Sequence, residues 1–280
     1  MPLKRLIKAV LPKPALHAAV RVRDGVNFLR VPKAAFDARN LRPANGLELR
    51  AIFTDESSAE AWRKDHAAIA PLFGTGERFG GVNPGDRRAI YYLVHALKPK
   101  RMLEIGTHVG ASTLYIARAL RAAVPDGRLT TVDISDVNHP RDGAWVGVGL
   151  DRAPRDMIRQ LDCERHVEFV VRPSLDFMAG AGETFDFIFL DGDHSARAVY
   201  LETAAACRLL RPGGAILLHD YYPEGRPLYA GGAAIVGPYR ALRRVRRECP
   251  DIAVLPLGAL PWPTKDGSNL TSLALVVKAA

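Results

Sequence analysis

The stretch that decides the fold is RMLEIGTHVGAST, residues 101–113. An apolar segment with strand character runs into Gly106 and Gly110, and small hydroxyl residues follow. A glycine turn between a strand and a helix is a place where α/β proteins bind phosphates and nucleotides. The stretch therefore raises the question of which ligand such a turn suits.

Helix and strand patterns alternate along the chain from residue 86 onward. Strands are predicted at 101–106, 128–134, 167–171, 185–191, 215–220, 252–257 and 270–278, mostly with amphipathic helices between them. Such alternation with short connections predicts an α/β, Rossmann-like fold with a seven-stranded, mostly parallel sheet and helices on both faces. Ligands of such sheets bind at the carboxyl ends of the strands, so the residues there matter most.

The first 75 residues have a different character from the rest. Prolines interrupt them, and their clearest helical pattern covers residues 56–70. We predict an N-terminal helical appendage over 1–75, serving as a lid or a dimer contact, and a main domain over 76–280. The glycine-rich segment 73–86 is predicted to be a hinge or loop between them.

The composition is that of a soluble globular chain. Its 280 residues are 48% hydrophobic, enough for one large α/β domain. No apolar run approaches the roughly 20 residues that span a bilayer, and the N-terminus lacks the apolar core of a secretory signal. The three cysteines are far apart without a CxxC pair, which predicts reduced thiols in a cytoplasm rather than disulfides or a zinc site.

The formal net charge of +9 is concentrated in residues 1–23 and in RALRRVRRE, residues 240–248. These tracts are either solvated helix faces or contacts for an anionic partner, namely nucleic acid, an acidic lipid surface or a phosphorylated substrate. No nucleic-acid-binding module is recognisable, and aromatic residues do not interleave the basic runs. Nucleic acid is therefore an unlikely partner.

The glycine turn itself matches neither of two familiar nucleotide loops. His108 stands where a dinucleotide-binding motif has its second glycine, and no lysine follows Gly110 as in a P-loop. Asp133 ends the next strand, where a carboxylate can accept hydrogen bonds from both ribose hydroxyls. A nucleoside with an amino-acid tail and no pyrophosphate, S-adenosylmethionine, fits these parts. The alternative is a tight turn with Asp133 as a helix cap.

Four motifs in order, LEIGTHVGAST, TVDIS, FDFIFLDGDHS and LLRPGGAILLHDY, resemble class I S-adenosylmethionine-dependent methyltransferases. More narrowly, they resemble the bacterial D-G-D-H-S group related to the catechol and caffeoyl-CoA type O-methyltransferases. The resemblance covers about residues 80–278. It implies that the methionine end of the cofactor is lined by Glu104, Gly106, His108, Gly110 and Ser112. It also implies that Asp133 holds the ribose, Ile134 and Ser174 lie near the adenine, and Asp191 lies beside the methyl donor.

Two acids end strands that are adjacent in that fold. Adjacent strands lie about 4.8 Å apart, so Asp191 and Asp220 could share one Mg²⁺ ion. In the catechol-type relatives an asparagine follows the second aspartate, whereas this chain has Tyr221. His219 or Asp193 could contribute instead, so the predicted metal ligands are Asp191, Asp220 and His219. Asp193 is most simply the N-cap of the helix that follows.

His194 falls where those relatives carry a catalytic lysine, and a histidine can take a hydroxyl proton near neutral pH. The alternative is that His194 only adjoins a helix cap or contacts the cofactor. Residues 135–149 are predicted to form a flap with Trp145 stacking inside, or an exposed insertion. Residues 261–269 are predicted to form the turn of the last hairpin.

These features together predict a homodimeric small-molecule O-methyltransferase with Asp191, His194 and Asp220 as catalytic residues. The expected acceptor is a hydroxyl of a natural product, sugar or catechol-like compound. One alternative is a non-catalytic S-adenosylmethionine-binding or accessory protein. Another is an N-methyltransferase or a nucleic-acid methyltransferase, although the chain has no N-P-P-[YF] motif for flipped bases.

Overall fold

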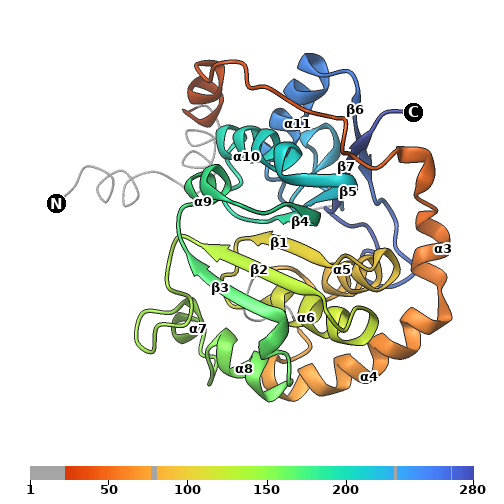
Figure 1. Ribbon diagram of the computed structural model, residues 1–280, viewed down its shortest axis with the longest axis vertical. Coiled ribbons are helices and arrows are strands. Elements are labelled where there is room, and N and C mark those ends of the chain that lie inside the picture. Colours follow the sequence, from red (N-terminus) through yellow and green to blue (C-terminus); the bar gives the residue numbers. More distant parts are fainter. Residues whose placement is uncertain (1–22, 77–80, 230–231, 266) are drawn as a thin grey trace.

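A seven-stranded sheet organises the computed structural model, which describes residues 23–76, 81–229, 232–265 and 267–280. The strands lie in the order β3-β2-β1-β4-β5-β7-β6 (Figure 1). In chain order they are β1 (Arg101–Ile105), β2 (Arg128–Asp133), β3 (Val167–Val171), β4 (Phe185–Leu190), β5 (Leu210–Leu218), β6 (Ile252–Pro256) and β7 (Ala274–Lys278). The predicted seven-stranded α/β fold is confirmed.

Strands β1 to β5 are parallel, and β7 runs antiparallel to both β5 and β6. The predicted, mostly parallel sheet is therefore confirmed, with β7 as the reversed strand. From β1 the chain moves outward to β2 and β3, then returns to place β4 on the other side of β1. This reversal leaves a crevice at the carboxyl ends of β1 and β4, where ligands of open α/β sheets bind.

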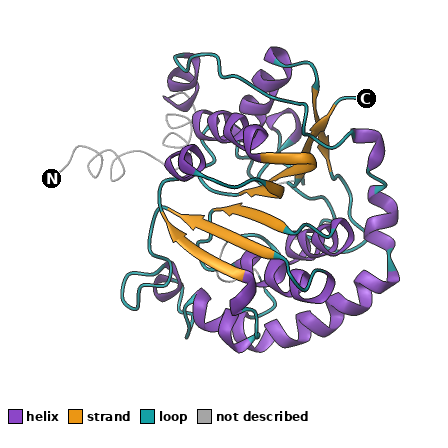
Figure 2. Ribbon diagram, in the orientation of Figure 1, coloured by secondary structure: helices purple, strands orange, loops and turns teal. Residues whose placement is uncertain are grey.

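Helices cover both faces of the sheet (Figure 2). They are α3 (Leu49–Thr54), α4 (Glu56–Phe73), α5 (Pro84–Leu97), α6 (Ala111–Ala123), α7 (Ala144–Gly147), α8 (Pro154–Gln160), α9 (Ser174–Gly180), α10 (Ala196–Leu209) and α11 (Gly237–Glu248). Met102 on β1 packs with α4, α5 and α6, whereas its neighbour Leu103 packs with α10 and α11. Successive strand residues point to opposite faces, so nearly continuous apolar strands supply both cores.

Helix α5 begins inside the segment that was predicted to be a loop or hinge. Asn83 is its N-cap and accepts a hydrogen bond from the Asp86 amide, while Pro84 occupies the first helical position. Proline is suited to that position because its missing amide hydrogen has no partner within the helix anyway. The loop prediction for 73–86 is thus wrong for residue 73, which ends α4, and for residues 84–86, and residues 77–80 lie outside the described part of the chain.

Part of the predicted appendage packs directly against the sheet domain. Phe53 on α3 and Ile69 and Phe73 on α4 belong to the same buried cluster as residues of β1 and β4. Residues 23–29 are also helical, and Phe28 joins the cluster on the opposite face of the sheet. The helical character of the appendage is confirmed where the structure describes it, and the boundary at residue 75 stays a prediction.

The connection between β6 and β7 folds back over α5. Ala259 bridges to Leu270 within it, which confirms the predicted hairpin turn over 261–269 apart from residue 266, which is not described. The Trp262 indole donates a hydrogen bond to the Gly85 carbonyl at 3.0 Å. The Arg88 guanidinium lies over the Trp262 ring at 4.1 Å and over the Trp62 ring at 4.3 Å. Stacking of this kind joins α4, α5 and the hairpin connection.

Cys163, Cys207 and Cys249 are free thiols, as the sequence predicts. Across the described ranges, the helices lack the length and apolarity that would let one cross a membrane.

A buried ion pair joins α4 to α6 and gives a test of how firmly α4 is held. Asp65 accepts hydrogen bonds from Arg118 and, at 2.7 Å, from the Tyr91 hydroxyl. Asp65→Ala leaves the buried guanidinium unpaired and should lower the free energy of unfolding by about 3 kcal/mol, measured by urea denaturation. Glu60→Ala, an exposed change on the same helix, should stay within about 0.5 kcal/mol of the wild type. Equal stability of the two variants would contradict a structural role for the pair.

Candidate active site

A cavity of about 1010 Å³ opens at the carboxyl ends of the parallel strands. Its walls come from the chain just after β1, β2, β3, β4 and β5, and from the N-terminal end of α5. Most of the residues predicted for the site lie on these walls, namely Gly106, His108, Asp133, Ile134, Ser174, Asp191, His194, His219 and Asp220. The cavity is of the size that holds a cofactor or small ligand.

Gly106 is required where β1 leaves the sheet. Its φ is +96°, and an added Cβ would lie 2.2 Å from the Asp191 carbonyl oxygen. Gly110, with φ of +82°, would place a Cβ 3.1 Å from Pro154 instead. The first glycine therefore lets the ends of β1 and β4 approach each other. The second packs against the start of α8 and does not line the cavity, although it was predicted to.

Asp133 ties the glycine turn to the end of β2. One carboxylate oxygen accepts hydrogen bonds from the amides of Thr107 at 3.2 Å and His108 at 3.0 Å. The other accepts from the Ser135 amide at 3.0 Å. Oδ1 accepts only the Ser135 bond and has capacity for a further donor, so the carboxylate can hold the turn and still bind a ligand in the cavity. The next residue, Ile134, is 73% exposed on the same wall, which leaves its side chain available to a ligand.

Glu104 and Ser112, both predicted to line the methionine end of a cofactor, lie behind the turn and off the cavity wall. The Glu104 carboxylate accepts hydrogen bonds from Ser112 at 2.5 Å, Thr113 at 2.6 Å and Thr131 at 2.6 Å. Burial raises the pKa of Glu104 to about 7, against the effect of the three hydroxyls. In this structure the carboxylate thus fastens α6 to β1 and β2.

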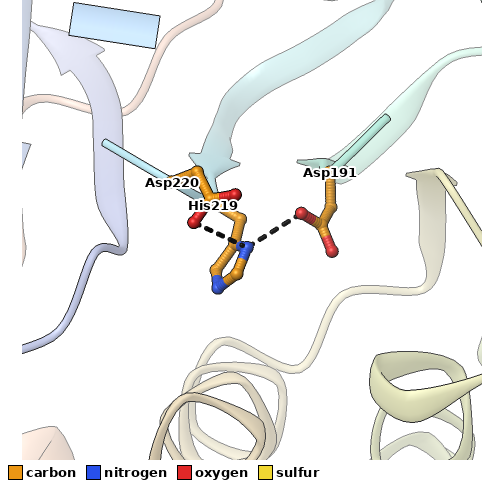
Figure 3. Close-up of side chains that lie close together, drawn as sticks. All are labelled: Asp191, His219 and Asp220. Carbon is orange, nitrogen blue, oxygen red and sulfur yellow. Dashed lines mark hydrogen bonds and ion pairs between the residues drawn. The ribbon is translucent and has the colours of Figure 1, made fainter. Parts of the chain in front are cut away.

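Asp191, His219 and Asp220 meet where β4 and β5 end (Figure 3). His219 Nδ1 lies 2.9 Å from Asp191 Oδ1 and 3.6 Å from Asp220 Oδ1. Asp220 adopts the left-handed region at φ of +56°, which is uncommon for a residue with a side chain. Burial opposes protonation of His219, but the carboxylates of Asp191 and Asp220 outweigh it and raise the pKa of the ring well above its usual value.

The donor atoms of these three residues fit a divalent cation. One ligand atom from each of Asp191, His219 and Asp220 can be chosen so that all lie within 4.8 Å of one another. Two carboxylates and an imidazole are common ligands of such ions. Tyr221, which replaces the asparagine of the catechol-type relatives, is buried beside Tyr239 and off the cavity wall, so it adds no ligand.

His194 lies on the cavity wall with Nε2 3.4 Å from Asp220 Oδ2. The His194 ring therefore lies between the Asp220 carboxylate and the open cavity. The prediction that Asp193 caps the next helix is wrong. Ser195 is the N-cap of α10, because its hydroxyl accepts from the Ala198 amide, while Asp193 accepts from the Ser195 amide at 2.8 Å.

Trp145 does not reach the cavity. It lies in α7, a one-turn helix within the connection 135–149, and packs half-buried against the core on the side of α6 and α8. The predicted stacking of Trp145 inside a flap over the ligand is therefore not seen in this structure.

The sequence missed one residue that is central to this site. Asp86 is fully buried in the first turn of α5, and its Oδ2 lies 3.3 Å from His219 Nε2. The same oxygen accepts a hydrogen bond from the side-chain Nδ2 of Asn83 at 2.7 Å. The N-P-G-D pattern marks a helix start, but nothing in it indicates that the helix points at the end of β5. Arg197 and Lys265 also line the cavity without having been predicted.

Ser174 lies on the wall after β3, as predicted, and donates to Glu202 Oε1 at 2.6 Å. Burial raises the pKa of Glu202 to about 7, against the effect of this hydrogen bond. The serine and the acid both line the cavity.

Comparison with known proteins matches this arrangement to one family. A family model described as a methyltransferase domain matches residues 103–221. The catechol O-methyltransferase of Mycobacterium tuberculosis is 30% identical over 185 residues, covering 65% of this chain and 76% of that protein. The chain belongs to the S-adenosylmethionine-dependent O-methyltransferases. This confirms the resemblance noted from the four motifs.

Other members of the O-methyltransferase family show the extent of the match. A catechol O-methyltransferase from Niastella koreensis is 31% identical over 147 residues, or 52% of this chain and 61% of that protein. The chain thus spans less than two thirds of that relative. The O-methyltransferase of Bacillus cereus, solved in complex with SAH, has a TM-score of 0.51 and 24% identity, covering 80% of this chain and 92% of that one. That likeness shows the shared fold.

The close approach of Gly106 to the Asp191 carbonyl allows a test of whether this O-methyltransferase needs a glycine at the end of β1. Gly106→Ala adds a methyl group that collides with the Asp191 backbone, whereas Gly149→Ala meets nothing within 4 Å at a similarly positive φ of +74°. Both variants carry the conformational cost, about 1 kcal/mol. Gly106→Ala should lose roughly 1–3 kcal/mol more in thermal or urea unfolding, because the crowded strand ends must shift. Equal losses would show that β1 and β4 tolerate separation.

Proposed function

We propose that the protein transfers the methyl group of S-adenosylmethionine to a hydroxyl group of a small molecule. The observation that carries the proposal is the single cavity that joins two different walls. Asp133 and Ile134 lie on one wall, and Asp191, His194 and Asp220 lie on the other. The first set suits a nucleoside and the second suits proton transfer from a hydroxyl.

The cofactor would lie across the reversal point between β1 and β4. Asp133 would accept hydrogen bonds from the ribose hydroxyls, and the exposed Ile134 would cover the adenine with Ser174 nearby. Gly106 and His108 would border the methionine end, where the N-terminus of α6 favours a carboxylate. Glu104 and Ser112 would support this end from behind the turn, through the hydrogen bond that they share.

The acceptor would lie beside Asp191, with its hydroxyl next to His194. In the reaction the hydroxyl oxygen forms a bond to the methyl carbon while the bond from that carbon to the sulfonium sulfur breaks, leaving a neutral thioether. The His194 ring takes the hydroxyl proton, and Asp220, whose Oδ2 lies 3.4 Å from Nε2, stabilises the resulting imidazolium. Alignment of the two reactants in one cavity supplies much of the rate enhancement.

Asp191, His219 and Asp220 would hold a divalent cation if the protein uses one. When bound, such an ion acts as a Lewis acid that favours the ionised form of the acceptor hydroxyl. The buried Asp86 would fix the ring of His219 from the opposite side.

Several finer features form part of the same proposal. The acceptor class is a natural product, a sugar or a catechol-like compound. The chain would act as a homodimer in the cytoplasm, with residues 1–75 as an appendage to the domain over 76–280. Binding of the cofactor without transfer to any acceptor would favour a non-catalytic or accessory role instead, and transfer to an amine would favour an N-methyltransferase.

Calorimetry with S-adenosylmethionine tests the wall of the cavity that is proposed to bind the cofactor. Asp133→Asn keeps one oxygen to accept from the amides of Thr107 and His108 but removes the negative charge. Affinity for S-adenosylmethionine should fall about tenfold or more because a charged acceptor for the ribose hydroxyls is lost. Asp136→Asn, an exposed change three residues further on, should bind like the wild type. Absence of binding by the wild type would contradict the proposal as a whole.

Methyl transfer to a panel of hydroxylated acceptors tests the other wall. His194→Gln should bind the cofactor as the wild type does, yet its kcat should fall by about a hundredfold or more because the proton acceptor is lost. Assays after thorough chelation and with added Mg²⁺ measure the part played by a metal. Activity unchanged by chelation would remove the metal from the mechanism, and an undiminished kcat in His194→Gln would remove the proposed base.

A further inference from the structure

A second cavity, of about 670 Å³, lies between the helix of residues 23–29 and α11. None of its lining residues belongs to the candidate active site. Its walls combine the apolar side chains of Val26, Phe28 and Leu29 with four arginines, Arg240, Arg243, Arg244 and Arg247. The helix of residues 23–29 and α11 both lie at the top of the molecule in Figure 1. The methyltransferase reaction proposed above makes no use of this region.

Two apolar side chains of this region face outward. Leu29 is 84% exposed and Val26 is 45% exposed, and they are one helical turn apart. Phe28, between them in sequence, is buried against Tyr200 with ring centroids 5.5 Å apart. A single exposed leucine is ordinary on a protein surface. Here, however, the two exposed residues share one helix face and border a row of arginines.

Three of the four arginines differ in what they contact. Arg244 pairs with Glu248 at 2.7 Å and donates to the carbonyls of Phe28 and Val31, so it fastens the helix of residues 23–29 to α11. Arg243 and Arg247 are exposed and lie one turn apart on α11. Arg244 thus holds the two helices together, whereas Arg243 and Arg247 present positive charge at the surface.

Among the described residues, the nearby acids interact with Arg240 and Arg244 rather than with Arg243 and Arg247. Glu248 is occupied by Arg244 and the Tyr200 hydroxyl. The Asp24 carboxylate accepts a hydrogen bond from the Ala196 amide at 3.1 Å, at the N-terminus of α10. In the sequence, residues 1–23 contain six basic residues and no acid. In the described part of the chain, the positive charges of Arg243 and Arg247 are therefore not offset by an ion pair.

We propose that Val26, Leu29, Arg243 and Arg247 form a docking surface for an anionic lipid bilayer. Apolar side chains at the level of the acyl chains and arginines at the level of the phosphates are the features by which peripheral helices bind such membranes. The association is peripheral and independent of the proposed methyl transfer.

Two other occupants match this surface less well. Single-stranded nucleic acids use exposed aromatic rings for stacking, whereas the exposed side chains here are aliphatic and Phe28 is buried. A second copy of the same surface would bring like charges together, which opposes association. An acidic lipid surface satisfies both the charge and the apolar side chains.

The docking surface is attached to the rim of the active-site cavity. Asp24 holds the N-terminus of α10, directly after His194 and Ser195. Helix α11 begins at Gly237, where an added Cβ would lie 2.0 Å from the His194 carbonyl oxygen. A bilayer bound to this surface would therefore lie close to the segment that carries His194.

Flotation of the full-length protein with vesicles tests the proposal. The wild type should float with vesicles of phosphatidylglycerol and phosphatidylcholine but not with phosphatidylcholine alone, and added salt should release it. Arg243→Glu combined with Arg247→Glu should weaken binding at least roughly tenfold, since each basic residue at a membrane contributes several-fold to affinity. Leu29→Ser should weaken binding without changing the charge.

Arg50→Glu combined with Lys64→Glu is the matched control, because it makes the same change of charge on exposed residues of α3 and α4. This variant should float like the wild type. Equal losses of vesicle binding in the two double variants would overturn the proposal, because attraction between the overall positive charge of the protein and the anionic vesicles would then explain binding. Failure of the wild type to float, or tighter binding to a DNA or RNA oligonucleotide than to the vesicles, would also overturn it. Circular dichroism of each variant shows whether the fold is retained.

Discussion

The candidate site depends on the contact between a glycine and a backbone carbonyl. Gly106 can lie against the carbonyl of Asp191 because it has no side chain, and the two strand ends then stay in register. The Asp191 amide donates to the Ile105 carbonyl at 2.8 Å, and the His219 amide donates to the Leu190 carbonyl at 3.1 Å. These bonds extend the parallel ladders one residue beyond each strand. The wall proposed for the cofactor and the wall proposed for the acceptor meet there because the backbones approach so closely.

Buried polar groups around that contact connect the sheet to its helices. The Glu104 carboxylate accepts hydrogen bonds from hydroxyl groups of α6 and β2. His219 lies between Asp191, which follows β4, and Asp86 of α5. Buried charges are costly unless they are paired, so each of these groups constrains its neighbours. Helices α5 and α6 are consequently fixed in orientation, and they support the site from the face of the sheet that they share.

The sequence predicts the fold and the strand-end residues because both follow from local patterns. Apolar runs separated by amphipathic helices require a parallel sheet, and the carboxyl ends of parallel strands meet at one edge, so Asp133, Asp191 and Asp220 had to lie near one another. Tertiary contacts decide the rest. Glu104 faces inward because hydroxyls from α6 and β2 satisfy it, and Asp86 lies 133 positions from its partner His219. Capping of α10 by Ser195 rather than Asp193 depends on backbone angles that no local pattern fixes.

The reversed strand β7 has a consequence for how such a protein can change over time. Because β6 and β7 form an antiparallel hairpin at the edge of the sheet, their connection can gain or lose residues without disturbing the register of β1 to β5. That connection supplies Lys265 and Ser272 to the cavity. A change of length or sequence in this connection would therefore alter one wall of the cavity while the glycine turn and Asp133 keep their geometry.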